Sequence, residues 1–481
     1  MKRPLCVVCL ILLCFALAGC LPESTDQVTV PVTRPATDET AAATAEPALP
    51  TSTTETATAT PTPLPSPTLA PTEASLIPAP PMQEMVDNVT AVAADAIAYV
   101  QWEKLYMRTL PDGNIVSVHK EPCPEGGYCA LAYPKWSPDG QYLLYYYYDG
   151  SSDSLRVSDR QGNVQIIDNV AFMRPGEWSP DGRTIVYFLE TDTVLEQEES
   201  DRPAPRLIEV WTVAVAEDGT LGEPQVAGTW RQFGDGCGGG GRSTSEVLYE
   251  NEGGTPYGYR MGVIEWSAPG ILLYNLDCTN IGIGRFDMAS GTELPGFDML
   301  LRNLVLNNSG DRWYAVTGYA WDRENPDDNL LVTGTPDSTE ITVIPTSAKV
   351  ELVFVGQASG SLYYTERNPL ERESLDNMGL YFGFYESALW RIQPDGSGEE
   401  RLLFGEDVQA YAQMEETAAG DLLFVLVEND RPLFEAVQFP ELDAEALQAY
   451  YPARHIMQLP ASGGDPVMIL SSAGQPALTL P

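Results

Sequence analysis

The sequence has little histidine and little positive charge, and each shortage excludes a class of function. It contains 2 histidines, 27 Lys and Arg residues and 68 Asp and Glu residues, for a formal net charge of −41. A surface this negative repels nucleic-acid phosphates and anionic lipid headgroups, so nucleic acid is not expected as a partner. Because His119 and His455 lie far apart in the sequence, a histidine-based catalytic triad is not expected. Each histidine is interpreted as an ordinary surface or loop residue.

Recognisable catalytic motifs are missing as well. No G-x-S-x-G nucleophile elbow occurs, and the glycine-rich segment 234–242 lacks the Gly-Lys-Ser/Thr ending of a phosphate-binding loop. Carboxylate pairs are plentiful, but a chain this acidic offers them by chance, so they identify neither a glycosidase nor a calcium site. The sequence therefore predicts no catalytic residues, no metal ion and no cofactor.

Large apolar residues are scarce between residues 20 and 85, where the chain consists mainly of Thr, Pro, Ala and Glu. Such a segment cannot bury enough surface to offset the entropy lost on ordering, so we expect a disordered tether over residues 20–85. The folded part is then expected over residues 86–481. That length is long for one domain, but closed all-β architectures often reach it.

The first twenty residues combine positive charge, an apolar stretch and a cysteine. Lys2 and Arg3 precede the stretch, which ends in Leu-Ala-Gly before Cys20. The stretch is shorter than a membrane-spanning helix, which needs about 20 apolar residues. This order resembles the signal of bacterial lipoproteins, in which the cysteine is lipidated and becomes the mature N-terminus. The resemblance implies a signal peptide over residues 1–19, a lipid on Cys20, and anchoring to the outer face of a membrane in a bacterial cell envelope.

Four cysteines remain beyond the signal and Cys20, namely Cys123, Cys129, Cys237 and Cys278. An even number in an exported chain suggests disulfides. Cys123 and Cys129 enclose a short loop that can close on itself, which leaves Cys237 with Cys278. A zinc site is the alternative interpretation, although no C-x-x-C spacing occurs and histidine is scarce.

The string Trp-Ser-Pro-Asp-Gly occurs twice, each time before a run of strand-forming residues. Its two copies consist of Trp136, Ser137, Pro138, Asp139 and Gly140, and of Trp178, Ser179, Pro180, Asp181 and Gly182. Proline presets φ at the second turn position and glycine accepts the strained last position, so each string should reverse the chain. The residues that follow predict a buried strand, and each tryptophan is expected to pack against a neighbouring sheet.

Weaker copies of this unit alternate with a second element, a strand, a glycine turn and another strand. The weaker copies span 265–278, 306–320, 356–366 and 415–428. The second element is found seven times, at 104–119, 154–168, 209–227, 282–296, 329–345, 388–404 and 456–471. Each pair of elements makes a four-stranded unit of about 40 residues or more, a repeat typical of β-propellers. We predict an all-β chain that forms a single propeller of six or seven blades, with seven favoured.

The repeated Trp-Ser-Pro-Asp-Gly turn, an apolar strand and a strand ending in a glycine turn together resemble the TolB-type, WD40-like (PD40) propeller repeat. The resemblance covers most of residues 95–471. It implies a propeller of six or seven blades.

Three segments interrupt the repeat pattern, at 190–207, 230–261 and 440–455. The first is acidic and is expected to be exposed. The third has apolar residues at helical spacing and is expected to form a short helix that caps the last blade. We interpret all three as insertions into the propeller.

A propeller offers a central funnel and surface loops, where ligands generally bind. The aromatic residues considered as ligand contacts are Tyr146, Tyr148, Trp211, Tyr257, Tyr259 and Trp321. Packing between blades is the other interpretation of these rings. Without a recognisable catalytic set, the sequence favours a binding or scaffold module outside the cell, with a protein, peptide or glycan as ligand. The alternative is a propeller hydrolase or lyase that acts on polysaccharide through carboxylates in the central funnel.

Overall fold

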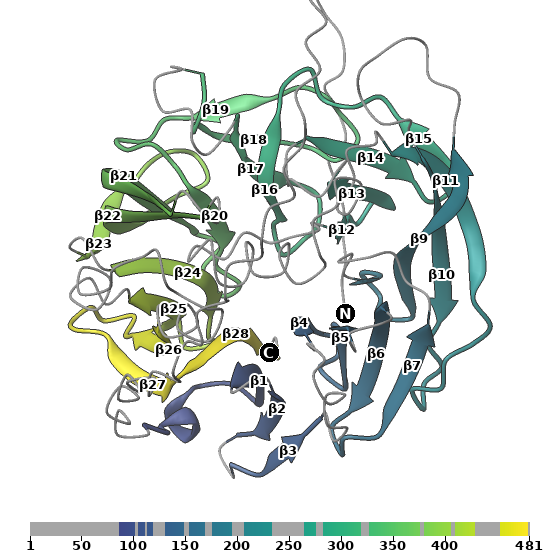
Figure 1. Ribbon diagram of the computed structural model, residues 1–481, viewed down its shortest axis with the longest axis horizontal. Coiled ribbons are helices and arrows are strands. Elements are labelled where there is room, and N and C mark those ends of the chain that lie inside the picture. Colours follow the sequence, from purple (N-terminus) through teal and green to yellow (C-terminus); the bar gives the residue numbers. More distant parts are fainter. Residues whose placement is uncertain are drawn as a thin grey trace, which may run out of the picture. The chain divides into compact units, whose positions relative to one another are not determined.

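Seven four-stranded antiparallel sheets surround one axis as the blades of a β-propeller (Figure 1). The computed structural model describes residues 86–101, 104–110, 113–118, 130–148, 153–168, 176–194, 206–232, 264–275, 282–318, 327–375, 380–405, 409–428 and 453–479. Apart from the 3-10 turn η1 (Val89–Ala91), every regular element in these ranges is a strand. The all-β, seven-bladed fold expected from the repeat is therefore confirmed.

Each blade is a meander whose innermost strand faces the axis. Innermost strand first, blade 1 consists of β28 (Ala473–Leu478), β1 (Ala96–Gln101), β2 (Lys104–Thr109) and β3 (Ile115–Ser117), and blade 2 consists of β4 (Ala130–Trp136), β5 (Tyr142–Tyr148), β6 (Asp153–Asp159) and β7 (Val164–Asp168). Blade 3 consists of β8 (Glu177–Trp178), β9 (Thr184–Val194), β10 (Arg206–Ala214) and β11 (Gln225–Gln232), and blade 4 consists of β12 (Ile264–Trp266), β13 (Ile271–Asn275), β14 (Ile283–Asp287) and β15 (Thr292–Leu294). Blade 5 consists of β16 (Leu301–Leu306), β17 (Trp313–Thr317), β18 (Leu331–Gly334) and β19 (Thr342–Ile344). Blade 6 consists of β20 (Leu352–Val355), β21 (Leu362–Leu375), β22 (Leu380–Ile392) and β23 (Glu400–Gly405). Blade 7 consists of β24 (Gln409–Glu416), β25 (Leu422–Glu428), β26 (Ala453–Leu459) and β27 (Val467–Ser471).

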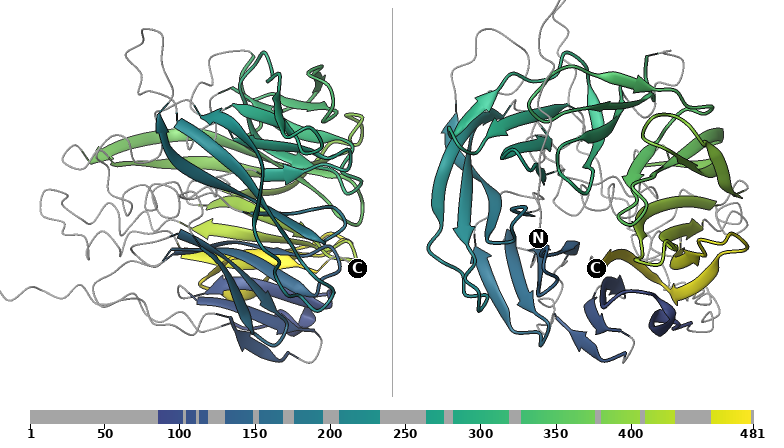
Figure 2. Two further views of the ribbon diagram at one scale, coloured as in Figure 1. Left: turned by 90° about the vertical axis from the view of Figure 1, so that its right-hand side faces the viewer. Right: turned by 180° about the vertical axis from the view of Figure 1, so that it is seen from behind.

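Two kinds of connection alternate along every blade. The first and second strands of blades 2 to 7, and the third and fourth strands of every blade, are joined by short turns, and we call the end of the ring where these turns lie the turn face. The strand ends that bound the gaps in the described chain lie at the opposite face, except around 111–112. In the edge-on view of Figure 2, the end of β28 lies on the side of the short turns. The turn face is thus the better described side of the ring.

The two full copies of the repeat fold as the sequence predicts. Ser137 Oγ donates to Asp139 Oδ1 (2.6 Å) and accepts from the backbone N–H of Tyr142 (3.0 Å). Gly140 closes the turn with φ of +65°, a value that side chains disfavour. Ser179 Oγ makes the equivalent bond to Asp181 (2.6 Å). The serine hydroxyl therefore links the turn to the start of the next strand.

Two of the four weaker copies keep this hydroxyl and lose the aspartate. In blade 4, Ser267 Oγ accepts from the backbone N–H of Ile271 (3.0 Å), although the turn contains no aspartate. In blade 7, Thr417 Oγ1 accepts from the backbone N–H of Asp421 (3.1 Å). In blade 5, Asn307 takes this position and its Oδ1 accepts from the backbone N–H of Arg312 (3.1 Å), whereas blade 6 has Gly356 there.

Blade 1 takes its innermost strand from the end of the chain. Ala96 N–H donates to Thr479 Oγ1 (3.0 Å), and Thr479 N–H donates to the Ala96 carbonyl (3.1 Å). These bonds match those that Ser137 makes with Tyr142 across the turn in blade 2. The closure of the ring therefore reproduces the hydrogen bonds of the repeat without a covalent turn.

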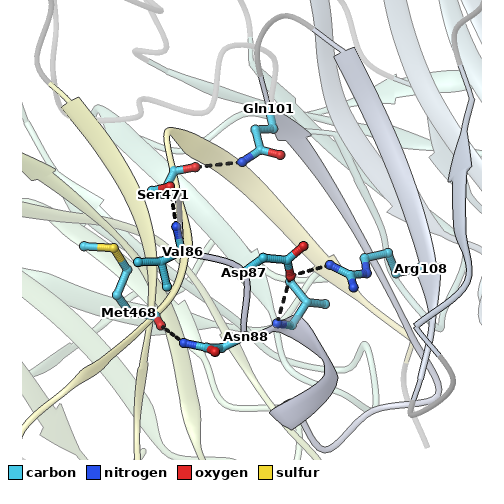
Figure 3. A network of polar contacts seen from close by, with 8 residues as sticks. Val86, Asp87, Asn88, Gln101, Arg108, Met468 and Ser471 are labelled. Carbon is cyan, nitrogen blue, oxygen red and sulfur yellow. Dashed lines mark hydrogen bonds and ion pairs between the residues drawn. The ribbon is translucent and has the colours of Figure 1, made fainter. Parts of the chain in front are cut away.

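The first described residues form a second connection between blades 7 and 1. The backbone N–H of Val86 donates to Ser471 Oγ (3.1 Å), and Gln101 Nε2 donates to the Ser471 carbonyl (2.8 Å). Asp87 forms an ion pair with Arg108, whose side chain is buried (Figure 3). The chain thus enters the ring along β27 and crosses to blade 1.

Tryptophan packing between blades is also confirmed. Trp136 Nε1 donates to the Ala477 carbonyl in the innermost strand of blade 1 (3.0 Å). Trp178 Nε1 donates to the Lys135 carbonyl in the innermost strand of blade 2 (3.2 Å). Each indole therefore binds the blade that precedes its own.

Several predictions from the sequence concern residues at the ends of the described ranges or outside them. Residues 190–194 and 206–207 continue β9 and β10, residues 230–232 end β11, and residues 453–455 begin β26, so the predicted helix cannot include 453–455. The remaining parts of the three insertions, and the residues Cys20, Cys123, Cys129, Cys237 and Cys278, lie outside the described residues. Within the described ranges, no helix is both long and apolar enough to cross a membrane.

Candidate functional site

All seven innermost strands line one cavity in the central channel. Its volume is about 410 Å³. Residues of the tight turns also line it, including Pro138, Pro180, Gly310 and Gln357. The cavity therefore lies in the half of the channel that is nearer to the turn face.

Three innermost strands contain β-bulges that redirect side chains beside the cavity. Tyr133, Asn303 and Gln413 adopt positive φ values of 56°, 51° and 46°. Strand pairing shifts register at each of these sites. The residues after the three shifts, which all line the cavity, are Lys135, Val305 and Glu415. Bulges of this kind re-aim side chains at the cost of local strain.

A cluster of three charged side chains spans the innermost strands of blades 2, 3 and 4. Lys135 Nζ is hydrogen-bonded to Glu177 and lies 3.8 Å from Glu265 Oε2. The Lys135 side chain is 42% exposed, whereas those of Glu177 and Glu265 are 7% and 12% exposed. The ammonium thus lies between two buried carboxylates and is the most accessible member of the cluster.

Burial raises the pKa of Glu177 from its ordinary value of 4.5 to about 7. The nearby Glu265 carboxylate raises it as well, whereas the Lys135 ammonium and the hydrogen bond from the backbone N–H of Trp178 (2.9 Å) lower it. Burial prevails because it disfavours the charged carboxylate. The charge of the cluster therefore changes near neutral pH.

The repeat contains a signal for this cluster that the sequence analysis missed. Lys135, Glu177 and Glu265 each stand directly before the tryptophan of their copy of the repeat. Alignment of the three copies on that tryptophan places the charged residues in one column. Trp266, from the third copy, also lines the cavity and is half-buried.

The aromatic candidates named from the sequence contribute to packing instead. Tyr146, Tyr148 and Trp211 belong to one apolar cluster between blades 2 and 3, and Trp211 stacks on Tyr187 with ring centroids 6.5 Å apart. The interpretation as inter-blade packing is therefore correct for these three. The remaining candidates, Tyr257, Tyr259 and Trp321, lie outside the described residues.

His455 is not a surface or loop residue, so that expectation is wrong. It lies in β26 with a fully buried side chain, and burial lowers its pKa. Its Nδ1 accepts from the backbone N–H of Ser472 (3.4 Å), and its Nε2 lies 3.7 Å from Glu428 Oε2. Over the described part of the chain, no three His, Cys, Asp or Glu side chains gather into a group that could hold a metal ion.

No family model and no curated protein matches this chain. Among solved structures it is similar to TolB from Acinetobacter baumannii, with 13% identity, a TM-score of 0.35, and coverage of 67% of this chain and 66% of TolB. It is also similar to oligogalacturonate lyase from Vibrio parahaemolyticus, with 10% identity, a TM-score of 0.45, and coverage of 79% and 92%. A third similar structure is puromycin hydrolase, with 14% identity, a TM-score of 0.40, and coverage of 73% and 52%. The chain thus spans just under two thirds of TolB and about half of puromycin hydrolase.

Proposed function

We propose that this protein is a lipid-anchored binding or scaffold module on the outer face of a bacterial membrane. Its ligand, a protein, peptide or glycan, enters the channel cavity from the turn face. The observation that carries this proposal is the cavity itself, which all seven innermost strands line. Its volume of about 410 Å³ lies within the range of about 300–1,000 Å³ that is typical of ligand pockets.

The architecture around the cavity supports a binding role. The tight turns that line its mouth are held by hydrogen bonds, as in Ser137–Asp139 and Ser179–Asp181. A mouth built from such turns loses little conformational entropy when a ligand binds. The lipoprotein-like segment ending at Cys20 supports the anchor and the location, and the acidic composition argues against nucleic acid.

Site-specific photo-cross-linking in the native envelope tests this proposal. A benzophenone amino acid in place of Gln357 lies at the cavity mouth, and the same residue in place of Val226 lies on the outermost strand of blade 3, where the side chain is 50% exposed. We expect a discrete adduct at position 357 and none at 226. Equal labelling at both positions, or none at 357, would contradict the proposal. Mass spectrometry of the adduct distinguishes protein from glycan.

One observation favours a second candidate, a hydrolase or lyase that acts on polysaccharide through carboxylates. A glutamate with a pKa of about 7 has the property that general acid catalysis needs. Against this role, Glu177 is nearly buried and its carboxylate is bonded to Lys135. Glu177→Gln should abolish turnover of a polysaccharide panel if Glu177 is the acid. Unchanged turnover in this variant, or no turnover by the unmodified protein, rejects this role for Glu177.

A further inference from the structure

Among the described residues that line the cavity, the charged ones are three carboxylates and one ammonium. Glu177, Glu265 and Glu415 come from the innermost strands of blades 3, 4 and 7, and Lys135 comes from blade 2. With every group ionised, the cavity has an excess of negative charge. A ligand that brings positive charge is therefore favoured over a neutral or anionic one.

The three members of the cluster differ in how firmly they are held. Glu177 and Glu265 are 7% and 12% exposed, so they have little freedom to move. The Lys135 side chain is 42% exposed, so its ammonium is the member of the cluster that a ligand in the cavity reaches first. The structure thus contains two nearly buried carboxylates with a partly exposed cation between them.

We infer that the cavity binds a lysine or arginine side chain of a protein or peptide partner, whose cationic group takes the place of the Lys135 ammonium between Glu177 and Glu265. This inference rests on the proposed function and specifies the class of its ligand. Lys135 acts as an internal competitor that keeps the carboxylate pair neutralised when no partner is bound. The half-buried ring of Trp266, which also lines the cavity, suits the aliphatic stem of such a residue.

Titration of the cluster determines how binding should depend on pH. A cation between the carboxylates favours the charged form of Glu177, whose pKa is about 7 in the free protein. The groups that face Glu177 are the Lys135 ammonium, the Glu265 carboxylate and the backbone N–H of Trp178. Because Lys135 already supplies such a cation in the free protein, its exchange for the partner's cation should leave the pKa of Glu177 little changed, and affinity should depend only weakly on pH near 7.

Fluorescence anisotropy tests the inference with the full folded chain. The probe is a dye-labelled Gly-Lys-Gly-Lys-Gly peptide, and its control is the same peptide with both lysines acetylated. Lys135→Met removes the competitor and should tighten binding of the lysine peptide by about tenfold or more, since close charges interact strongly in a partly buried site. Glu265→Gln should weaken binding by a similar factor.

Glu223→Gln is the matched control, because Glu223 is exposed in a turn of blade 3 and does not line the cavity. It removes the same charge from the acidic surface without changing the cluster. Equal weakening by Glu265→Gln and Glu223→Gln would overturn the inference, since general attraction to an acidic protein would then explain binding. No tightening by Lys135→Met, with circular dichroism showing a folded variant, would overturn it as well.

The two proposals can fail separately. If position 357 cross-links to a partner but the lysine peptide binds no better than its acetylated form, only the ligand class is wrong. A glycan adduct at position 357 would also mean that only the ligand class is wrong. If neither experiment gives a signal at the cavity, both proposals are wrong.

Discussion

Blades 3 and 7 each place a buried glutamate in the innermost strand, and the two carboxylates have different surroundings. Glu177 of blade 3 lies beside the cavity and is bonded to the Lys135 ammonium. Glu416 of blade 7 stands one position later in the repeat, where blades 2, 3 and 4 have tryptophan. Its carboxylate accepts hydrogen bonds from the backbone N–H groups of Ala358 (2.8 Å) and Ser359 (2.7 Å).

A shift of one residue changes the role of the carboxylate because side chains alternate along a strand. Glu416 also accepts from Tyr363 Oη (2.8 Å), so three neutral donors of blade 6 hold it. Tryptophan at the equivalent positions bonds to the preceding blade in the same way. Position 416 therefore joins blades, whereas position 177 places charge in the channel.

The largest effect that tests this comparison is expected from Glu416→Ala. The substitution leaves the N–H groups of Ala358 and Ser359 and the hydroxyl of Tyr363 without their acceptor. The Tyr363 hydroxyl is a buried donor, the two N–H groups are part-buried, and truncation of a buried side chain leaves a cavity, so the free energy of unfolding should fall by about 3–5 kcal/mol. Urea unfolding followed by tryptophan fluorescence measures this change.

Glu416→Gln is the control for this prediction. Glutamine keeps one oxygen acceptor at the same position and should retain more of the stability than alanine does. A loss below about 1 kcal/mol for Glu416→Ala would contradict the role of position 416 in joining blades 6 and 7.

A smaller effect is expected from Glu177→Gln, and it should depend on pH. Folding raises the pKa of Glu177 from 4.5 to about 7, so the fold favours the protonated form. The stability that this group contributes is fully present below pH 4.5 and is lost as pH rises through 7. At about 1.4 kcal/mol per pKa unit, the loss is roughly 3 kcal/mol.

Glutamine mimics the protonated acid and does not titrate. The difference in unfolding free energy between the native protein and Glu177→Gln should therefore change by roughly 3 kcal/mol between pH 4.5 and 8, in favour of the variant at high pH. Glu223→Gln, at an exposed position, should show no such change. A difference that does not vary with pH would mean that Glu177 does not titrate as described.

The blades could be predicted from the sequence because the turns that define them are local. Proline at position 138 and glycine at position 140 specify a reversal within five residues, and the structure places the turn there. The closure by β28 could not be predicted in this way. Its partner β1 lies at the other end of the folded chain, and Pro476 makes β28 an unpromising strand by local propensity.

The cavity was harder to predict than the blades because its residues are defined by register. Pro134, directly after Tyr133, is a local sign of a bulge, because proline within a sheet is confined to strand edges and bulges. Nothing comparable marks Gln413, whose positive φ glycine or asparagine would adopt more readily. The charged residues directly before the tryptophan were visible in three copies of the repeat. Their position beside the channel follows only from the direction of the innermost strands.

The smallest effect is expected within blade 7, where two glutamates are adjacent. Glu415 lines the cavity and is half-buried, and Glu416 is buried between blades. If the register argument holds, Glu415→Gln should change the unfolding free energy by less than about 1 kcal/mol, because a partly hydrated carboxylate contributes little to stability. Glu416→Gln should cost clearly more, although it makes the same chemical change one residue away. Parallel urea titrations of the two variants measure this difference. Equal losses would mean that strand alternation does not separate a channel position from a position that joins blades, and the comparison between blades 3 and 7 would fail with it.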